Sequence, residues 1–225
     1  MTCVVATQAL IFQDGGLLAM GANLFNMAIV SVLVSHLVYT LIQKISVGKK
    51  WGLLAGGFLA AWVSVEAAAL SCALQLSFSG TIPSRIVIPV MGGVHALIGL
   101  GEGLITIGAL SYIYATRSDL LQAGSLYPKN SRGLLIGGTI LASTLAILSP
   151  LASSYPDGLD SIAQRYGFMN LEHFLDFPPL SGYTMPGIYN PVYGTILAAL
   201  LGAFVVFLLV GLIAFIRRHG LLKRE

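Results

Sequence analysis

The sequence predicts an all-α, polytopic membrane helix bundle with five full spans, an amino-terminal half-helix and a small extracytoplasmic loop domain. Of its 225 residues, 56% are hydrophobic and only 9% are charged, whereas a soluble domain carries about 25% charged residues. Several apolar stretches are long enough to cross a hydrocarbon core of roughly 30 Å. The composition excludes a soluble globular domain. The net charge of +3 does not indicate a nucleic-acid partner, because the basic residues flank apolar spans.

Five stretches can be read as complete membrane spans. Each of the first four ends near Gly, Pro or charged residues that mark short loops, and the last ends at a pair of arginines. The five predicted spans are Gly21–Ile42, Trp51–Phe78, Ile86–Ala115, Gly133–Ser153 and Tyr193–Ile216.

The basic residues predict the orientation of these spans. Three Lys/Arg lie between the first and second spans, three between the third and fourth, and four after the last. If those regions are cytoplasmic, ten of the twelve Lys/Arg lie inside, as membrane proteins prefer. The carboxyl terminus is then cytoplasmic, and segment 154–192 is a loop on the outer side of the cell membrane.

The amino-terminal segment Met1–Phe12 is apolar and leads into a turn at Gln13-Asp14-Gly15-Gly16. Twelve helical residues rise only about 18 Å, so the segment would stop near the middle of the bilayer. We interpret it as the second half of a helix whose first half is absent. A re-entrant hairpin with its amine in a polar cavity is the alternative.

The outer loop contains a short helical pattern. Asp157 is placed to cap a helix over Gly158–Tyr166, and Gly167 is suited to end it in the left-handed conformation. Its apolar residues fall on one face. We expect a folded unit that packs on the membrane bundle.

Two ionisable residues interrupt the third span. His95 and Glu102 are seven residues apart and therefore lie on one helix face. Such groups are costly in a membrane and usually face a bundle interior, a cavity or an ion path. Either they serve as an ion path, a metal contact or a coupling relay, or they form an internal hydrogen-bonded pair that sets helix packing.

Three further polar residues are candidates for the same roles. Glu66 is a carboxylate in the middle of the second span, and it is a possible partner of His95 or His36. Asn23 and Asn26 share a face of the first span at a spacing of three residues. They either cap the span and bond a neighbouring loop, or line an outer cavity.

Motifs of common enzymes are absent from the sequence. It contains no H-E-x-x-H, no G-x-S-x-G and no phosphate-binding G-x-x-x-x-G-K-[ST]. We therefore expect no enzyme activity, no bound cofactor and no hydrolysis of ATP by this chain. Energy for uphill transport would come from a partner or an ion gradient.

Two long motifs resemble the CbiM/NikM family, the membrane substrate-capture (S) components of energy-coupling-factor transporters for cobalt and nickel. They are QALIFQDGGLLAMGANLFNMAIV in Gln8–Val30 and VHALIGLGEGLITIG in Val94–Gly108. The resemblance covers a first domain over residues 1–127. Residues 128–225 resemble the accessory PDGLE (CbiN/NikN-like) component of the same systems, here with PDGLD at Pro156–Asp160.

The resemblance implies uptake of Co²⁺ or Ni²⁺ as the transported substrate, for cobalamin biosynthesis or nickel enzymes. The implied partners are a transmembrane coupling (T) subunit and ATPase subunits. Family members hold the metal with an amino-terminal Met-His and a further histidine. That segment would lie upstream of Met1, so no metal ligand is identifiable here, and His95, Glu102, Asn23, Asn26 and Glu66 are second-layer or path candidates. The alternative function is a truncated, non-binding membrane scaffold of such a transporter.

Overall fold

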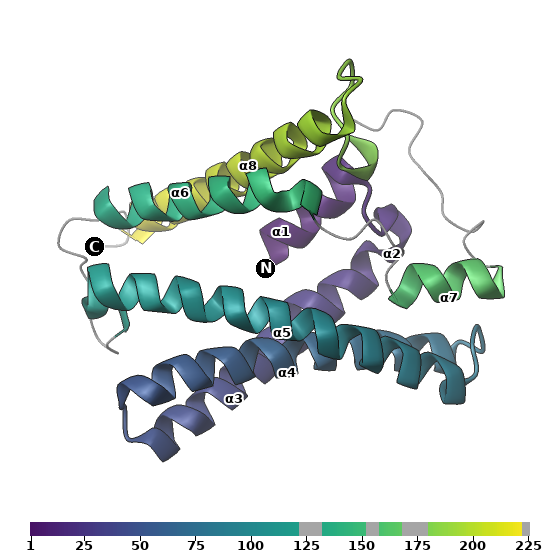
Figure 1. Ribbon diagram of the computed structural model, residues 1–225, viewed down its shortest axis with the longest axis horizontal. Helices are drawn as coiled ribbons and strands as arrows, with labels where there is room; N and C mark the ends of the chain where they lie inside the picture. Colours follow the sequence, from purple (N-terminus) through teal and green to yellow (C-terminus); the bar gives the residue numbers. More distant parts are fainter. Residues whose placement is uncertain (122–131, 152–157, 168–179, 222–225) are drawn as a thin grey trace. The chain divides into compact units, whose positions relative to one another are not determined.

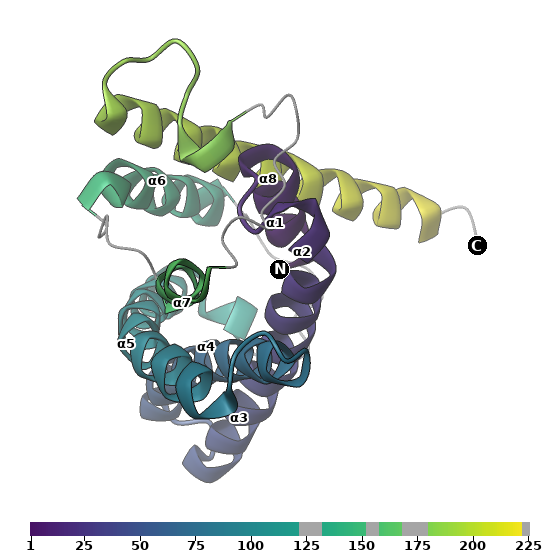
Figure 2. The same cartoon turned by 90° about the vertical axis from the view of Figure 1, so that its right-hand side faces the viewer.

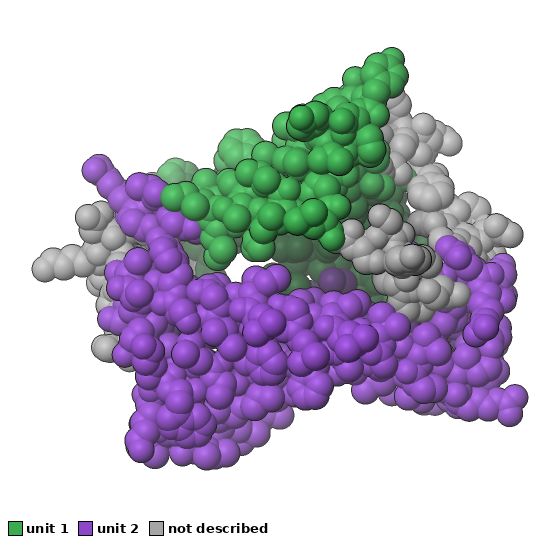
Figure 3. Space-filling model, viewed as in Figure 1, with its two compact units in different colours: residues 1–24, 139–154, 172–225 green, residues 25–138, 155–171 purple. Residues whose placement is uncertain are grey.

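The computed structural model describes residues 1–121, 132–151, 158–167 and 180–221, and these ranges contain helices and turns but no strand. The all-helical class is thereby confirmed. The chain forms two compact units, each described here by itself (Figure 3). Unit 1 comprises residues 1–24, 139–154 and 172–225, and unit 2 comprises residues 25–138 and 155–171.

Unit 2 is built around three long helices, α3 (Ser31–Ser46), α4 (Lys50–Phe78) and α5 (Ser84–Arg117) (Figure 1). Helix α4 packs on both α3 and α5. A π-helical turn, η2 (Leu24–Val30), precedes α3, and a short 3-10 turn, η3 (Ser118–Leu121), follows α5. Pro89 lies inside α5, which membrane helices tolerate where neighbouring groups satisfy the freed carbonyl.

The seam between α4 and α5 depends on small residues of α5. A Cβ atom added to Gly99 would lie 2.6 Å from Trp62 Cδ1, and one added to Gly103 would lie 2.6 Å from Phe58 Cδ2. The Trp62 indole also donates a 2.9 Å hydrogen bond to the carbonyl of Ala96. Small residues allow such close approach between membrane helices, so large aromatic side chains of α4 fit directly on the α5 backbone.

The helix predicted over Gly158–Tyr166 is present as α7 (Gly158–Tyr166) (Figure 2). Gly167 follows with φ of +76°, as expected for a left-handed stop. Ile162 is buried in the core cluster beside the α4–α5 turn, together with Ala73 and Ile82. The predicted packing of this helix on a membrane hairpin is therefore seen within unit 2. The proposed cap, Asp157, lies outside the described residues.

Unit 1 begins with a short apolar helix over the residues expected to form one. It consists of α1 (Thr2–Thr7) and the π-helical η1 (Gln8–Phe12). Gln13, Gly15 and Gly16 all have positive φ, so the helix reverses there into α2 (Gly16–Asn23). The predicted turn is confirmed.

The remaining helices are α6 (Arg132–Leu148), the 3-10 turns η4 (Ser149–Leu151) and η6 (Ser181–Tyr183), and α8 (Pro191–Leu221). Helix α8 starts with a capping arrangement that the sequence reading overlooked. Asn190 Oδ1 accepts hydrogen bonds from the backbone N–H of Val192 at 3.0 Å and Tyr193 at 3.4 Å. An Asn cap followed by Pro at the first helical position is a favourable helix start.

Four helices are long and apolar enough to cross a membrane: Gly16–Ser46, Lys50–Phe78, Ser84–Thr116 and Pro191–Arg217. They contain four of the five predicted spans. The fifth, expected over Gly133–Ser153, corresponds to the shorter apolar helix Leu135–Leu151, which rises only about 26 Å. The count of five spans remains a prediction. The first span begins earlier than expected, because α2, η2 and α3 form one continuous helical segment.

Candidate functional site

His95 and Glu102 lie on one unbroken helix, α5, as the sequence required. Seven residues of helix separate them by about 10 Å along the axis. His95 is half-buried, and its Nδ1 lies 2.8 Å from the carbonyl oxygen of Met91. Because a carbonyl can only accept, Nδ1 carries the proton and Nε2 keeps its lone pair in the neutral ring. Glu102 is exposed on the surface of α5.

A further ionisable group of the predicted spans, Glu66, lies in the seam between α4 and α5. Its Oε2 is 3.7 Å from the position that a Cβ atom on Gly92 would occupy, one helical turn before His95. Its Oε1 is buried and has no hydrogen-bond partner among the described residues. The expected bond to His95 or His36 is therefore not formed through this oxygen, and His36 itself is exposed. A buried, unpartnered carboxylate oxygen is costly.

Asn26 anchors the π-helical turn η2 to α4. Its side chain is 3% exposed. Asn26 Nδ2 donates to Gln75 Oε1 at 3.1 Å, while Gln75 Nε2 donates back to Asn26 Oδ1 at 2.9 Å. Ser71 Oγ donates to the same Oδ1 at 2.7 Å. These three bonds supply partners for the buried Asn26 amide and fix the position of η2 along α4.

A second polar group, formed by Gln8, Asp14 and Tyr183, surrounds the turn of unit 1. The Tyr183 hydroxyl donates to Asp14 Oδ2 at 2.7 Å and accepts from Gln8 Nε2 at 3.4 Å. The Tyr183 ring stacks on Phe12, with centroids 4.6 Å apart. Burial raises the pKa of the Tyr183 hydroxyl well above its ordinary value, and the bond and negative charge of Asp14 raise it further. The phenol therefore remains a hydrogen-bond donor throughout the neutral range.

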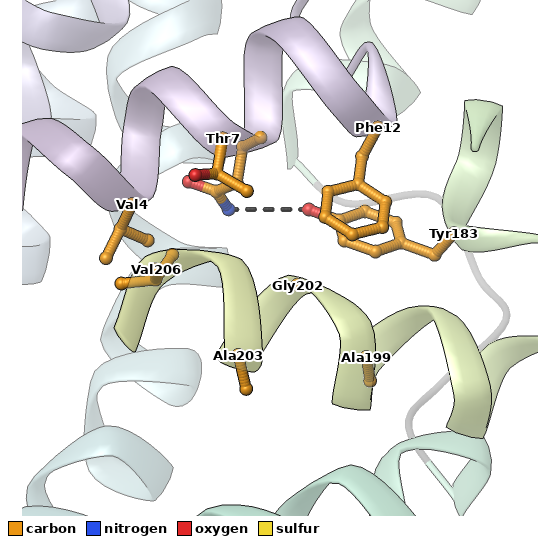
Figure 4. Close-up of a pocket in the computed structure, with 9 residues that line it drawn as sticks. Val4, Thr7, Phe12, Tyr183, Ala199, Gly202, Ala203 and Val206 are labelled. Carbon is orange, nitrogen blue, oxygen red and sulfur yellow. Dashed lines mark hydrogen bonds between the residues drawn. The ribbon is translucent and has the colours of Figure 1, made fainter. Parts of the chain in front are cut away.

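The same group borders a cavity of about 430 Å³ in unit 1. Its walls are one face of the amino-terminal helix, one face of α8 and the Tyr183 ring, as Figure 4 shows. Gly202 of α8 makes room for Phe12, because a Cβ atom there would lie 2.8 Å from the Phe12 ring. The lining is mostly apolar, and Gln8, Thr7 and Tyr183 supply its polar atoms.

The two candidate asparagines are used differently. Asn23 lies over the turn of unit 1, where its side chain occupies the space beside Gly15, while Asn26 bonds α4 in unit 2. Next to Asp14, Gln13 is 4% exposed, and neither polar atom of its amide has a hydrogen-bond partner among the described residues. The shared helical face predicted for Asn23 and Asn26 thus serves two different sets of contacts.

Within the described ranges, no group of three or more His, Cys, Asp and Glu side chains is placed to hold a metal ion. Four polar residues that matter in the structure were not singled out from the sequence: Gln8, Ser71, Gln75 and Tyr183. Ser71 and Gln75 carried a usable signal, since two polar residues four apart mark one face of an apolar helix. No local pattern could have indicated Tyr183, because its hydrogen-bond partners Asp14 and Gln8 are 169 and 175 residues away in the sequence.

Comparison with known proteins places the chain in a family. Residues 1–120 match the family model for the cobalt uptake substrate-specific transmembrane region (CbiM), and residues 132–219 match the PDGLE domain. No solved structure shows a significant match.

Relatives match along most of the chain. A protein of Archaeoglobus fulgidus, provisionally named as a fused nickel transport protein NikMN, is 33% identical over 93% of this chain and 68% of its own length. The fused nickel transport protein NikMN of Rhodobacter capsulatus is 26% identical over 93% of this chain and 71% of its own length. The cobalt transport protein CbiM of Sorangium cellulosum is 33% identical over 51% of this chain and 52% of its own length. The chain therefore belongs to the CbiM family of cobalt uptake substrate-specific transmembrane proteins and carries a PDGLE domain in the same polypeptide.

Proposed function

We propose that this chain is the substrate-specific membrane component of a nickel or cobalt uptake system. The observation that carries the proposal is the match of the chain to both a CbiM region and a PDGLE domain, an arrangement shared with proteins named as fused nickel transport proteins. The four apolar helices are consistent with a multi-pass membrane protein. Co²⁺ or Ni²⁺ is the transported substrate and not a resident cofactor.

The finer organisation is part of the same proposal. A CbiM-like domain occupies residues 1–127 and a PDGLE-type domain residues 128–225. Five spans cross the cell membrane, with the carboxyl terminus in the cytoplasm and residues 154–192 outside. A transmembrane coupling subunit and ATPase subunits supply the energy. The distribution of Lys and Arg supports this orientation, and the absence of a phosphate-binding loop motif from the sequence is consistent with ATPase partners.

We assign the seam of α4 and α5 as a supporting element for passage of the cation. His95 holds its Nδ1 proton on the Met91 carbonyl, which leaves Nε2 in the tautomer that binds divalent transition metals. Glu66 of α4 places Oε2 near Gly92, one turn before His95, while its buried Oε1 has no hydrogen-bond partner among the described residues. A passing cation would offset the cost of that buried oxygen. Glu102, Asn23 and Asn26 remain candidates for a second coordination layer or an ion path.

Uptake of radioactive Ni²⁺ and Co²⁺ by cells tests the proposal. The host lacks its own nickel and cobalt transporters and expresses this chain with its coupling and ATPase subunits. We expect uptake above that of cells without the chain. Glu66→Gln, which keeps shape and removes charge, should lower uptake at least tenfold while the complex still assembles. Ser64→Ala is the matched control, because Ser64 bonds only the Ala61 carbonyl of its own helix.

A second candidate function is a non-binding scaffold that only assembles the transporter. It is favoured by the polar groups that already join helices, namely Asn26 to α4 and Trp62 to α5. Uptake at background level, together with copurification of all subunits in normal proportion, would support the scaffold and refute the transport role. If uptake is unchanged in Glu66→Gln, the Glu66 carboxylate has a role in helix packing only and none in transport.

A further inference from the structure

One end of unit 2 gathers basic side chains from three helices. Lys44 ends α3, Lys49 and Lys50 begin α4, and Arg132 begins α6. All four side chains are exposed. Lys50 Nζ lies 5.0 Å from the centre of the Tyr114 ring near the end of α5. Lys44, Lys49 and Lys50 define a basic patch at the α3–α4 turn of unit 2.

The start of α6 is tied to the same end of the unit. The Tyr112 hydroxyl, two residues before Tyr114 on α5, donates a 3.0 Å hydrogen bond to the carbonyl of Gly133. Arg132 is the neighbour of Gly133, so it belongs to the same end of the bundle as Lys50. Tyr112 and Tyr114 are two residues apart and therefore point to nearly opposite faces of α5. Arg132 thus lies at this end of unit 2 but outside the cluster of lysines.

The helix dipoles favour a positive charge at one lysine of the patch and disfavour it at the other two. Lys44 lies in the last turn of α3, where a cation is favourable beside the negative end of the helix. Lys49 and Lys50 lie at the positive end of α4, where a cation is unfavourable. Lys49 forms no side-chain cap, and the first turn of α4 contains no acidic residue. The patch thus has an excess of positive charge that an external anion would neutralise.

Exposed apolar side chains surround the patch and indicate the kind of anion. Ile45 is 74% exposed, Val47 83% and Trp51 53%. Large apolar groups beside cations are typical of a helix end at the membrane interface, where Trp anchors the helix and Lys reaches the headgroups. A ligand that carries both a negative head and apolar tails matches both properties.

We propose that the basic patch of Lys44, Lys49 and Lys50 binds the phosphate headgroup of an anionic phospholipid. Trp51, Ile45 and Val47 contact the upper part of its acyl chains. The proposal rests on the proposed placement of the chain in a bilayer and is independent of the metal that it transports. Each lysine near an anionic membrane surface contributes about 1 kcal/mol, which corresponds to roughly fivefold in lipid affinity.

Native mass spectrometry and thermal unfolding of the purified full-length chain test the proposal. The chain is kept in phosphatidylcholine nanodiscs or mild detergent, and phosphatidylglycerol is added. We expect bound phosphatidylglycerol and a rise of Tm, both weakened by salt. The double variant Lys49→Gln/Lys50→Gln should lose about 25-fold in lipid affinity, by the roughly 1 kcal/mol for each lysine. Lys49→Arg/Lys50→Arg should retain it, which separates charge from misfolding.

The matched control removes the same charge elsewhere in unit 2. Arg85→Gln/Arg165→Gln deletes two exposed cations of α5 and α7 that lie outside the patch. An equal loss of affinity in this control would overturn the proposal, because binding would then follow net charge alone. Equal stabilisation by inorganic phosphate, or no preference for phosphatidylglycerol over phosphatidylcholine, would also overturn it. None of these outcomes bears on metal uptake, so the two proposals can fail separately.

Discussion

The polar groups of the α4–α5 seam come from neighbouring parts of the sequence, whereas those of the turn in unit 1 come from distant parts. The seam joins two helices that follow each other in sequence, and its contacts are packed so closely that Gly99 and Gly103 lie directly on Trp62 and Phe58. The turn joins Asp14 and Gln8 to Tyr183, more than 160 residues away. In the seam, Glu66 keeps a buried oxygen without a partner among the described residues. At the turn, the Tyr183 hydroxyl has both a donor and an acceptor.

This contrast separates two uses of polar groups in membrane proteins. A satisfied group, such as the Tyr183 hydroxyl, holds segments together and contributes to stability. A buried group without a partner among the described residues, such as Glu66 Oε1, lowers stability, and groups of this kind in native proteins call for an explanation such as a functional role. The seam is therefore where we expect substitutions to alter uptake, and the turn is where we expect them to alter assembly of unit 1.

The largest effect should follow from a methyl group added to the seam. Gly99→Ala places a Cβ atom against Trp62, and overpacking of this kind costs about 1–3 kcal/mol. The free energy of unfolding in mixed micelles, from titration with a denaturing detergent, would measure it. The matched control is Gly101→Ala on the same helix, because no atom lies within 4 Å of its added Cβ. Equal losses in the two variants would show that the effect is not steric.

Loss of the hydrogen bonds that the Asn26 side chain makes to α4 should give the next largest effect. Asn26→Leu removes three hydrogen bonds and leaves Ser71 and Gln75 without their partner. Stranded polar groups cost about 1–3 kcal/mol, and unit 2 should lose that much free energy of unfolding. In a double-mutant cycle, Asn26→Leu/Gln75→Leu should be more stable than the sum of the single changes predicts. Strict additivity would contradict the reciprocal pairing.

A smaller loss is expected at the turn. Tyr183→Phe keeps the stacking on Phe12 but removes the hydroxyl that joins Asp14 to Gln8. The loss should be about 1–1.5 kcal/mol, detected as faster proteolysis or hydrogen exchange of residues 8–16. Unit 2 should exchange as in the parent protein. Tyr183→Leu, which also removes the stacked ring, should lose more.

The smallest effect appears only at alkaline pH. The pKa of Tyr183 is raised in the folded chain by burial and by Asp14, whereas an unfolded tyrosine titrates near about 10. The folded state therefore holds this proton to higher pH, and the associated stability is complete below about pH 10 and declines above it. Protection of residues 8–16 should fall between about pH 10 and 11 in the parent protein more than in Tyr183→Phe. An identical decline in both would place the titration elsewhere.

Much of the secondary structure was predictable because helices depend on local patterns. The apolar stretches, the α7 helix and its Gly167 stop follow from residue order and from the conformational freedom of glycine. The span expected over Gly133–Ser153 is helical as far as Leu151, and its last two residues lie outside the described ones. The count of five spans remains a prediction. The site was less predictable. His95 and Glu66 stood out as ionisable residues in apolar spans, but the sequence did not reveal which atoms would be left without partners.

The sequence by itself determined the membrane class, the positions of four long apolar helices and the family to which the chain belongs. These follow from composition, from hydropathy over about twenty residues and from two long motifs. Only the tertiary structure decided that Asn26 bonds Gln75, that Glu66 lies beside Gly92, and that Tyr183 bridges Asp14 and Gln8. It also showed that Glu66 Oε1 has no partner among the described residues. Each depends on side chains that different segments bring within about 3–4 Å, which no local periodicity records.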